Sequence, residues 1–286
     1  MAVWDGAQVG VLLVSLETET QRWPDWNHGI VAGNTWNPLD STNGFADGIC
    51  KGVPVRCSQT GCTAYMKASI GDSSTGLAAA AREKIASDLA QILGAPVPPI
   101  CLCRYLGTDE IGCLSMVVSS SREHWSVVRP LKGWGANAFF TQMINSSLRN
   151  AALMFAFDSW VGQIDHGDDI PKPQLNILLC YEDVEDGEGE LIYIDYEKSL
   201  GVGGWSELKP APFPTYLLNN INVEHLFEFG EQISAIQDDD ISSVVERIPP
   251  LYLDPIEGAS ITRELIRRRD GLNTCLREWA TQEEST

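Results

Sequence analysis

Two short apolar runs joined by an acidic loop constrain the fold of this chain more than any other feature of its sequence. The runs are Leu175–Tyr181 and Leu191–Tyr196, and the loop between them, Glu182–Glu190, is rich in Gly, Asp and Glu. This pattern predicts an antiparallel hairpin whose solvated loop is longer than the tight two-residue kind. A hairpin folded about the middle of this loop brings Asn176 opposite Asp195. Two oxygen-bearing side chains are therefore expected to meet at one end of the hairpin.

An alanine-rich segment in the first half of the chain predicts a helix over residues 77–93. Ile85, Leu89 and Ile92 line one face of this helix, and Gly94, which is soon followed by proline, ends it. Short apolar runs predict strands before and after the helix. These strands are expected at Val9–Leu16, Val53–Cys57, Thr63–Ala68, Ile100–Tyr105, Ile111–Val118 and Trp125–Val128.

From about Asn137 the pattern becomes helical and is interrupted by the hairpin. A long, mostly apolar stretch up to Ile164 predicts one helix or two consecutive ones. The change of pattern places a boundary near residue 130, with residues 1–130 built on strands and one main helix, and residues 131–286 mostly helical. Further helices are expected at Val223–Ile236, Asp240–Arg247 and Ile261–Trp279.

Charge and hydropathy exclude several classes of function. A formal net charge of -19 argues against a nucleic-acid-binding surface, because backbone phosphates would be repelled. No stretch is long and apolar enough for a transmembrane helix, and the first apolar run follows an Asp rather than a basic segment. We therefore expect a cytoplasmic protein without a signal peptide and without direct contact to a membrane or to nucleic acid.

The cysteines fit the same compartment. Cys101 and Cys103 lie two residues apart within a predicted strand, and no Cys-x-x-Cys pair occurs among the eight cysteines. This spacing favours buried free thiols in a reducing cytosol over a zinc site.

Five polar residues follow one another in the order that kinase-like folds use for phosphoryl transfer from ATP. They are Lys67 in a strand, Glu83 in the helix, Asp165 in a loop, Asn176 at the start of the hairpin and Asp195 at its end. In such folds a Lys holds the phosphates, an acid orients the Lys, and a carboxylate positions the attacking hydroxyl. Magnesium prefers oxygen ligands, which the two hairpin residues supply. The order therefore indicates a phosphotransferase that uses ATP and Mg²⁺.

Several segments also resemble the core of HipA-like kinases, which belong to the protein-kinase-like superfamily. "FDSWVGQID", "LNILL" and "IYIDYEKSLG" resemble the catalytic segments, and "YMKAS" with "REKIASDLAQILGAPVP" resembles the Lys strand and the Glu-bearing helix. The resemblance spans about Val53–Gly201. It implies an α+β, two-lobed fold with a small antiparallel-sheet N-terminal lobe, a larger helical C-terminal lobe carrying a catalytic β-hairpin, and ATP between them. The activity that it implies is that of a serine/threonine protein kinase.

The resemblance also implies a role for each of the five residues. Lys67 would bind the phosphates, Glu83 would pair with Lys67, and Asp165 would be the catalytic acid–base residue. Asn176 and Asp195 would bind the metal.

Two features of the sequence depart from the kinase pattern. Ten residues separate Asp165 from Asn176, where protein kinases have about four, so Asp168 or Asp169 could take the catalytic role instead. No clear glycine-rich phosphate loop precedes the strand lysine, and the candidate is "STNGFADGICKG", which contains Gly44 and Gly48. His166, a single histidine beside acids, is interpreted as a loop residue.

The acceptor of the phosphate stays open at this point. The first alternative is a protein Ser or Thr, including one in the chain itself, and the second is a hydroxyl of a small molecule. A third is a pseudokinase-like binding module that holds a partner in its cleft or at Arg267–Arg269, a run interpreted as a solvated basic face. The family resemblance also raises a role in a bacterial toxin–antitoxin pair, with an antitoxin as partner.

Overall fold

The structure is a computed structural model that describes most of the chain. The ranges are 36–38, 52–58, 61–68, 73–104, 111–116, 122–124, 128, 138–167, 176–181, 189–201 and 207–283. The strand predicted at Val9–Leu16, the loop glycines Gly44 and Gly48, and the loop acids Asp168 and Asp169 lie outside these ranges. None of the described helices is both long and apolar enough to cross a membrane.

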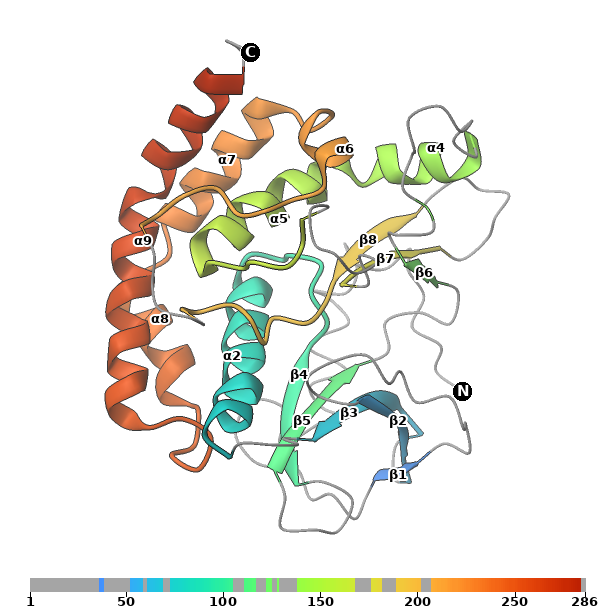
Figure 1. The fold of residues 1–286 in the computed structure, drawn as a ribbon, viewed down its shortest axis with the longest axis vertical. Coiled ribbons are helices and arrows are strands. Elements are labelled where there is room, and N and C mark those ends of the chain that lie inside the picture. Colours follow the sequence, from blue (N-terminus) through green and yellow to red (C-terminus); the bar gives the residue numbers. More distant parts are fainter. Residues whose placement is uncertain are drawn as a thin grey trace.

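A five-stranded antiparallel sheet with one helix against it forms the first part of the fold (Figure 1). The helix is α2 (Ser73–Ile92), and it packs against the two strands at one side of the sheet. The strand order is β1-β2-β3-β5-β4. The strands are β1 (Trp36–Pro38), β2 (Gly52–Cys57), β3 (Thr63–Ala68), β4 (Ile100–Arg104) and β5 (Ile111–Met116).

Alternation along β3 decides which side chains face α2. Ala64 and Met66 are fully buried in an apolar cluster of the sheet, to which none of the α2 side chains that the structure describes belongs. Because successive side chains of a strand point to opposite faces, Lys67 lies on the other face of the sheet, toward the helix. Its register partner Cys113 belongs to the core that α2 shares. The strand therefore presents its lysine to the helix that carries Glu83.

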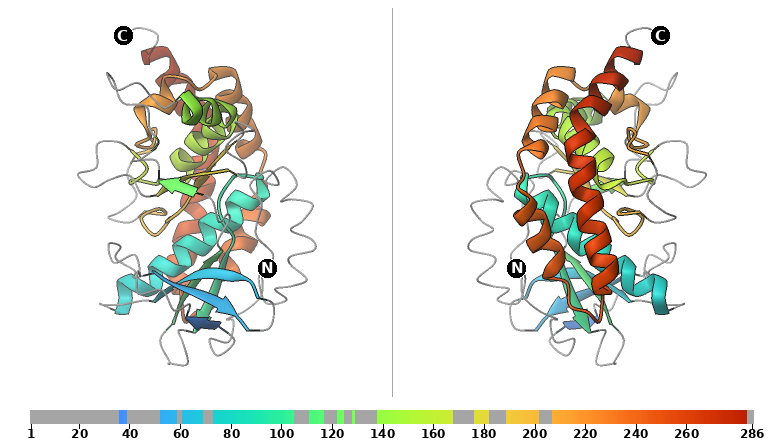
Figure 2. Two further views of the ribbon diagram at one scale, coloured as in Figure 1. Left: turned by 90° about the vertical axis from the view of Figure 1, so that its right-hand side faces the viewer. Right: turned by 90° about the vertical axis from the view of Figure 1, so that its left-hand side faces the viewer.

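Packed helices form the C-terminal part of the fold. They are α4 (Ala138–Ser146), α5 (Leu148–Val161), α6 (Thr215–Leu218), α7 (Val223–Ser234), α8 (Asp238–Glu246) and α9 (Pro255–Glu283). The helices α5, α7 and α9 pack against one another, and Figure 2 shows α9 running along one side of the molecule. The predicted apolar stretch before the hairpin thus forms two helices, separated at Ser147.

The predicted hairpin is formed by β7 (Ile177–Cys180) and β8 (Glu190–Tyr193), which pair in antiparallel register. A third strand, β6 (Arg122–His124), pairs with β7 on its other side. The strand predicted at Trp125–Val128 would follow β6 directly; residues 125–127 lie outside the described ranges, and Val128 is helical rather than extended. The boundary predicted near residue 130 falls among residues outside the described ranges and stays a prediction.

Two contacts attach the C-terminal helices to the sheet and to α2. The Tyr252 hydroxyl donates a hydrogen bond to the carbonyl oxygen of Cys103 in β4, at 2.8 Å. Arg82 of α2 forms an ion pair of 3.0 Å with Glu257 in the first turn of α9. That turn is itself capped by Asp254, whose Oδ1 accepts a hydrogen bond from the backbone N–H of Ile256. The helix that carries Glu83 is therefore also attached to the start of α9.

Glu190 corrects the prediction that the whole segment Glu182–Glu190 is a solvated turn. Residues 182–188 lie outside the described ranges, but Glu190 begins β8 and is buried. Its Oε1 accepts a hydrogen bond from Nδ2 of Asn150 at 3.0 Å. Burial raises the pKa of Glu190 to about 8, and the hydrogen bond from Asn150 offsets only part of that rise.

We expect Glu190→Gln to stabilise the protein at alkaline pH. The folded-state pKa lies above the ordinary value of 4.5, so the stability that this carboxyl group contributes is present below pH 4.5 and is lost as the pH rises through about 8. Gln keeps an acceptor for Asn150 and carries no charge. The free energy of unfolding of the variant should exceed that of the wild type by a few kcal/mol at pH 9, and the difference should become small near pH 4.5. Urea titrations at both pH values measure it, with the exposed Glu278→Gln as control; equal stabilities at pH 9 would contradict the prediction.

Candidate functional site

Lys67, Glu83 and Asp195 meet between the sheet, α2 and the end of the hairpin. Nζ of Lys67 lies 2.5 Å from Oε1 of Glu83 and 3.1 Å from Oδ1 of Asp195. The Glu83 side chain is 3% exposed, so the ion pair is shielded from water. These contacts join residues that are 16 and 128 positions apart in the sequence.

Mutual charge sets the protonation of this cluster. Burial acts to lower the pKa of Lys67, but the carboxylates of Asp195 and Glu83 outweigh it and raise that pKa well above its ordinary value. Burial acts to raise the pKa of Asp195, and the ammonium of Lys67 outweighs it and lowers that pKa. Lys67 is therefore cationic and Asp195 anionic at neutral pH.

The backbone at Asp195 has a left-handed conformation that turns its side chain toward the lysine. Its φ is 68°, a region in which Asp and Asn are among the few tolerated residues. Gln163 holds this turn by donating a hydrogen bond from Nε2 to the carbonyl oxygen of Asp195 at 3.0 Å. The chain thus leaves β8 and immediately directs a carboxylate into the site.

Asp165 reaches the site because α5 ends abruptly in front of it. Gly162 follows the helix with φ 68°, so that the chain reverses without the steric cost of a Cβ atom. The Asp165 side chain is 7% exposed, and its Oδ2 lies 2.9 Å from Nζ of Lys198. Burial raises the pKa of Asp165, and the neighbouring His166 and Lys198 counter that rise.

His166 lies in the loop after α5, as the sequence predicted, and its side chain is buried. Its Nδ1 lies 2.7 Å from Oδ2 of Asp158, and its Nε2 lies 3.1 Å from the carbonyl oxygen of Ile194. An acceptor thus lies at each ring nitrogen, and Nε2 of Gln163 lies 3.3 Å from Nε2 of the ring. Burial acts to lower the pKa of His166, but the Asp158 carboxylate outweighs it and raises the pKa to about 9. The other oxygen of Asp158 accepts a hydrogen bond from the Tyr196 hydroxyl at 2.9 Å.

This buried network joins the two segments that carry Asp165 and Asp195. The helix α5 supplies Asp158, the turn after it supplies His166, and the segment after β8 supplies Ile194 and Tyr196. Asp158 and His166 thus connect the segment that carries Asp165 to the segment that carries Asp195.

The hairpin places Asn176 at the same end as Asp195, but in a register that differs from the prediction. The backbone N–H of Ile194 donates to the carbonyl oxygen of Asn176 at 2.9 Å, and the next pair is Ile177 with Tyr193. Asn176 is therefore opposite Ile194 and not opposite Asp195. The left-handed turn at Asp195 comes directly after the last paired residues of the hairpin.

Two further residues of the site were not singled out from the sequence. Glu197 is buried, and one carboxylate oxygen from each of Glu83, Asp195 and Glu197 lies within 4.8 Å of the others. Oxygen ligands at this spacing fit a hard cation such as Mg²⁺. Lys198 is the second residue, and both follow Asp195 in "DYEKS", where a run of charges directly after a buried strand is the signal that could have indicated them.

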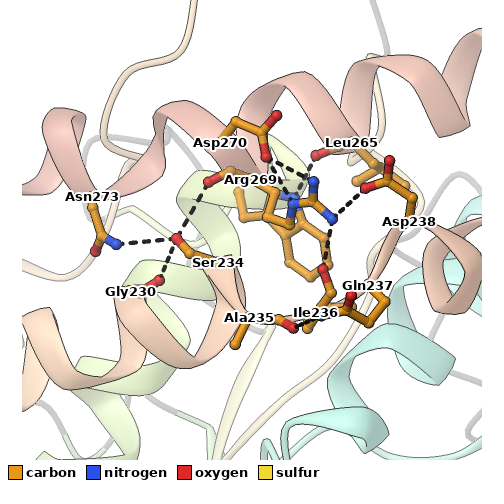
Figure 3. A network of polar contacts seen from close by, with 11 residues as sticks. Gly230, Ser234, Ala235, Ile236, Gln237, Asp238, Leu265, Arg269, Asp270 and Asn273 are labelled. Atoms are coloured by element: carbon orange, nitrogen blue, oxygen red, sulfur yellow. Dashed lines mark hydrogen bonds and ion pairs between the residues drawn. The ribbon is translucent and has the colours of Figure 1, made fainter.

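The predicted solvated basic face at Arg267–Arg269 is largely internal. Arg268 donates to the carbonyl oxygens of Ser159 and Trp160, both at 2.7 Å, and so caps the C-terminal end of α5. Figure 3 shows Arg269 between α9 and the end of α7, where it contacts the Ile236 carbonyl oxygen and two Asp side chains. Arg267 pairs with Glu264 one turn away. Arg268 and Arg269 therefore hold helices together and are not free for a partner.

Comparisons with known proteins identify the fold. No protein-family profile matches the sequence, and no curated protein matches it significantly. Among solved structures, the Helicobacter pylori proinflammatory kinase CtkA is similar over 87% of this chain and 99% of its own, with a TM-score of 0.58 and 12% sequence identity. HipA of Shewanella oneidensis MR-1, solved with HipB and operator DNA, matches over 92% of this chain and 72% of its own, with a TM-score of 0.45 and 12% identity. The likeness to CtkA shows that this chain has a kinase-like α+β fold, as the sequence resemblance implied.

Proposed function

We propose that this chain, which has the fold of a kinase, is an ATP- and Mg²⁺-dependent phosphotransferase that acts as a serine/threonine protein kinase. One observation carries the proposal: Nζ of Lys67 contacts both Glu83 and Asp195. Phosphoryl transfer needs a lysine on the phosphates, an acid that orients it and a carboxylate for the metal. The fold brings these three side chains together from three separate elements.

In this proposal Lys67 neutralises charge on the phosphates while Glu83 fixes the direction of its ammonium. Asp195, with Asn176 at the same end of the hairpin and Glu197 beside it, would hold magnesium. When bound, magnesium neutralises the phosphate oxygens and aligns them for in-line attack. The low pKa of Asp195 keeps this carboxylate ionised and so ready to bind a cation.

Asp165 is proposed as the residue that orients the acceptor hydroxyl and takes its proton. It lies on the turn after α5, and the shared anchor of Asp158 and His166 holds it near Asp195. Asp168 and Asp169 follow in the same segment, outside the described residues, and compete for the role. Separate Asp165→Asn, Asp168→Asn and Asp169→Asn variants identify the acid, because removal of the true base lowers kcat with little change in the KM for ATP.

A protein acceptor is favoured over a small molecule by the sequence resemblance to HipA-like kinases. Similarity to a chain described as a kinase supports phosphotransfer in general and not a particular acceptor. A protein partner such as an antitoxin rests on the sequence resemblance alone. The internal contacts of Arg268 and Arg269 remove one surface that a pure binding module could have used.

The test is to incubate the purified protein with Mg²⁺ and γ-labelled ATP, with and without generic protein substrates, and to measure both label transfer and the thermal shift. Label on Ser or Thr that disappears with EDTA and in Lys67→Met is the expected result. Lys209→Met, at an exposed position, is the matched control. A thermal shift without transfer would indicate a nucleotide-binding module, and transfer only to an added small alcohol or sugar would indicate a small-molecule phosphotransferase. The absence of both a thermal shift and label transfer would overturn the proposal.

A further inference from the structure

Lys198 is the second lysine of the candidate site, and its position differs from that of Lys67. It follows β8 by a few residues, and its ammonium lies 2.9 Å from Oδ2 of Asp165. The Asp165 side chain is 7% exposed, whereas that of Lys198 is 36% exposed. In this ion pair the carboxylate is buried, whereas the lysine is partly accessible to solvent.

The negative charge at the site favours a second cationic side chain beside the phosphates. Among the described residues, the carboxyl groups of Glu83, Asp165, Asp195 and Glu197 lie at the site. Burial raises the pKa of Glu83 to about 8, whereas Asp195 is anionic, and a nucleotide would add the negative charges of its phosphates. Lys67 is already held from two sides by Glu83 and Asp195. An ammonium has three N–H donors, so Lys198 can bind Asp165 and one further acceptor at the same time.

We propose that Lys198 is a further catalytic residue, whose ammonium bridges the Asp165 carboxylate and the terminal phosphate of the bound nucleotide. The inference rests on the proposed function and deepens it. As the bond from the terminal phosphorus to the leaving diphosphate oxygen breaks, a bond to the acceptor oxygen forms, and the acceptor proton passes to Asp165. Lys198 holds the transferred phosphoryl group next to the carboxylate that receives the proton. Its positive charge offsets the charge on the equatorial oxygens.

The alternative role for Lys198 is purely structural, as a partner that ties the segment after β8 to the turn after α5. An ion pair with one partly exposed member contributes little to stability. The buried contacts of His166 with Asp158 and with Ile194 already join the same two segments. A structural role and a phosphate-binding role make different predictions for ATP and ADP, because ADP lacks the terminal phosphate.

The experiment compares wild type, Lys198→Met and the exposed control Lys209→Met by calorimetric titration with Mg²⁺ and either a non-hydrolysable ATP analogue or ADP. We expect Lys198→Met to weaken binding of the ATP analogue about 10-fold and to leave ADP binding within about 2-fold, as loss of one charge-assisted phosphate contact predicts. Its kcat should fall about 100-fold, since the contact strengthens in the transition state. Lys198→Arg should recover much of the discrimination between the two nucleotides.

The outcomes separate this inference from the proposed function. If wild type transfers phosphate and Lys198→Met retains both kcat and the preference for the ATP analogue, Lys198 is not catalytic. Equal weakening of both nucleotides together with a lower melting temperature would assign Lys198 a structural role and overturn the inference. Lys172 lies between Asp165 and Asn176 in the sequence, outside the described residues; loss of discrimination in Lys172→Met but not in Lys198→Met would overturn it too. If wild type binds neither nucleotide, the proposed function itself fails.

Discussion

Asp195→Asn should reduce the proposed phosphotransfer by about 1,000-fold or more, because the variant loses the charge of the proposed metal ligand at the point where phosphate charge must be neutralised. Asn is the sharpest replacement. It keeps the size of the side chain, and it tolerates the left-handed φ of 68° that most residues would occupy only with strain. A loss of activity in Asp195→Asn therefore reports the charge and not a distorted turn.

The measurement is kcat with labelled ATP over a range of Mg²⁺ concentrations. The apparent affinity for Mg²⁺ should fall together with kcat, whereas the melting temperature should change little. Asp239→Asn, at an exposed position on α8, removes the same charge far from the site and should leave kcat unchanged. Full phosphotransfer by Asp195→Asn at limiting Mg²⁺ would remove Asp195 from the metal site.

Asp158→Ala should destabilise the protein by about 3–5 kcal/mol, the largest effect on stability that we expect from a single change. Asp158 is fully buried, and its two oxygens accept from His166 and Tyr196. Truncation leaves two buried donors without their acceptor, and each such loss costs about 1–3 kcal/mol. The doubly protonated state of His166 also loses the carboxylate that stabilises it.

Chemical denaturation at pH 7 measures this free energy of unfolding. Tyr196→Phe removes one donor of the same network, but Asp158 keeps its contact with His166. The variant should therefore cost only about 1 kcal/mol. Asp239→Ala serves as the exposed control. A loss below about 1 kcal/mol in Asp158→Ala would mean that water or another group replaces the lost contacts.

The sequence predicted those parts of the fold and of the site that depend on local pattern. The helix with Glu83 has alanine-rich propensity and a Gly94 stop, and the hairpin has two apolar runs around a polar loop. The order of Lys67, Glu83 and Asp195 along the chain indicated which side chains would meet. The structure brings these three together through the alternation of β3 and the turn after β8.

The parts that the sequence could not predict depend on contacts between distant segments. The loop position of His166 was predicted, but its burial was not, because its partner Asp158 lies in α5 and the reversal at Gly162 brings the two side chains together. Arg268 was predicted to be solvated because its acceptors are backbone carbonyls 108 and 109 positions away. Every residue has such a carbonyl, so no residue type indicates the contact. The register of Asn176 was off by one residue because the strands pair Ile177 with Tyr193, and the midpoint of a long loop does not determine that pairing.

The attachment of α2 to the C-terminal helices limits how this protein can be switched on and off. A swing of α2 would separate Glu83 from Lys67, but it would also have to break the ion pair of Arg82 with Glu257 at the start of α9. On the same side, the hydrogen bond of Tyr252 to Cys103 ties the C-terminal part to the sheet. A displacement of α2 would thus disturb its ion pair with the start of α9 and its packing against α8. An isolated movement of α2 would therefore break contacts on two sides, those of Glu83 with Lys67 and those with the C-terminal helices.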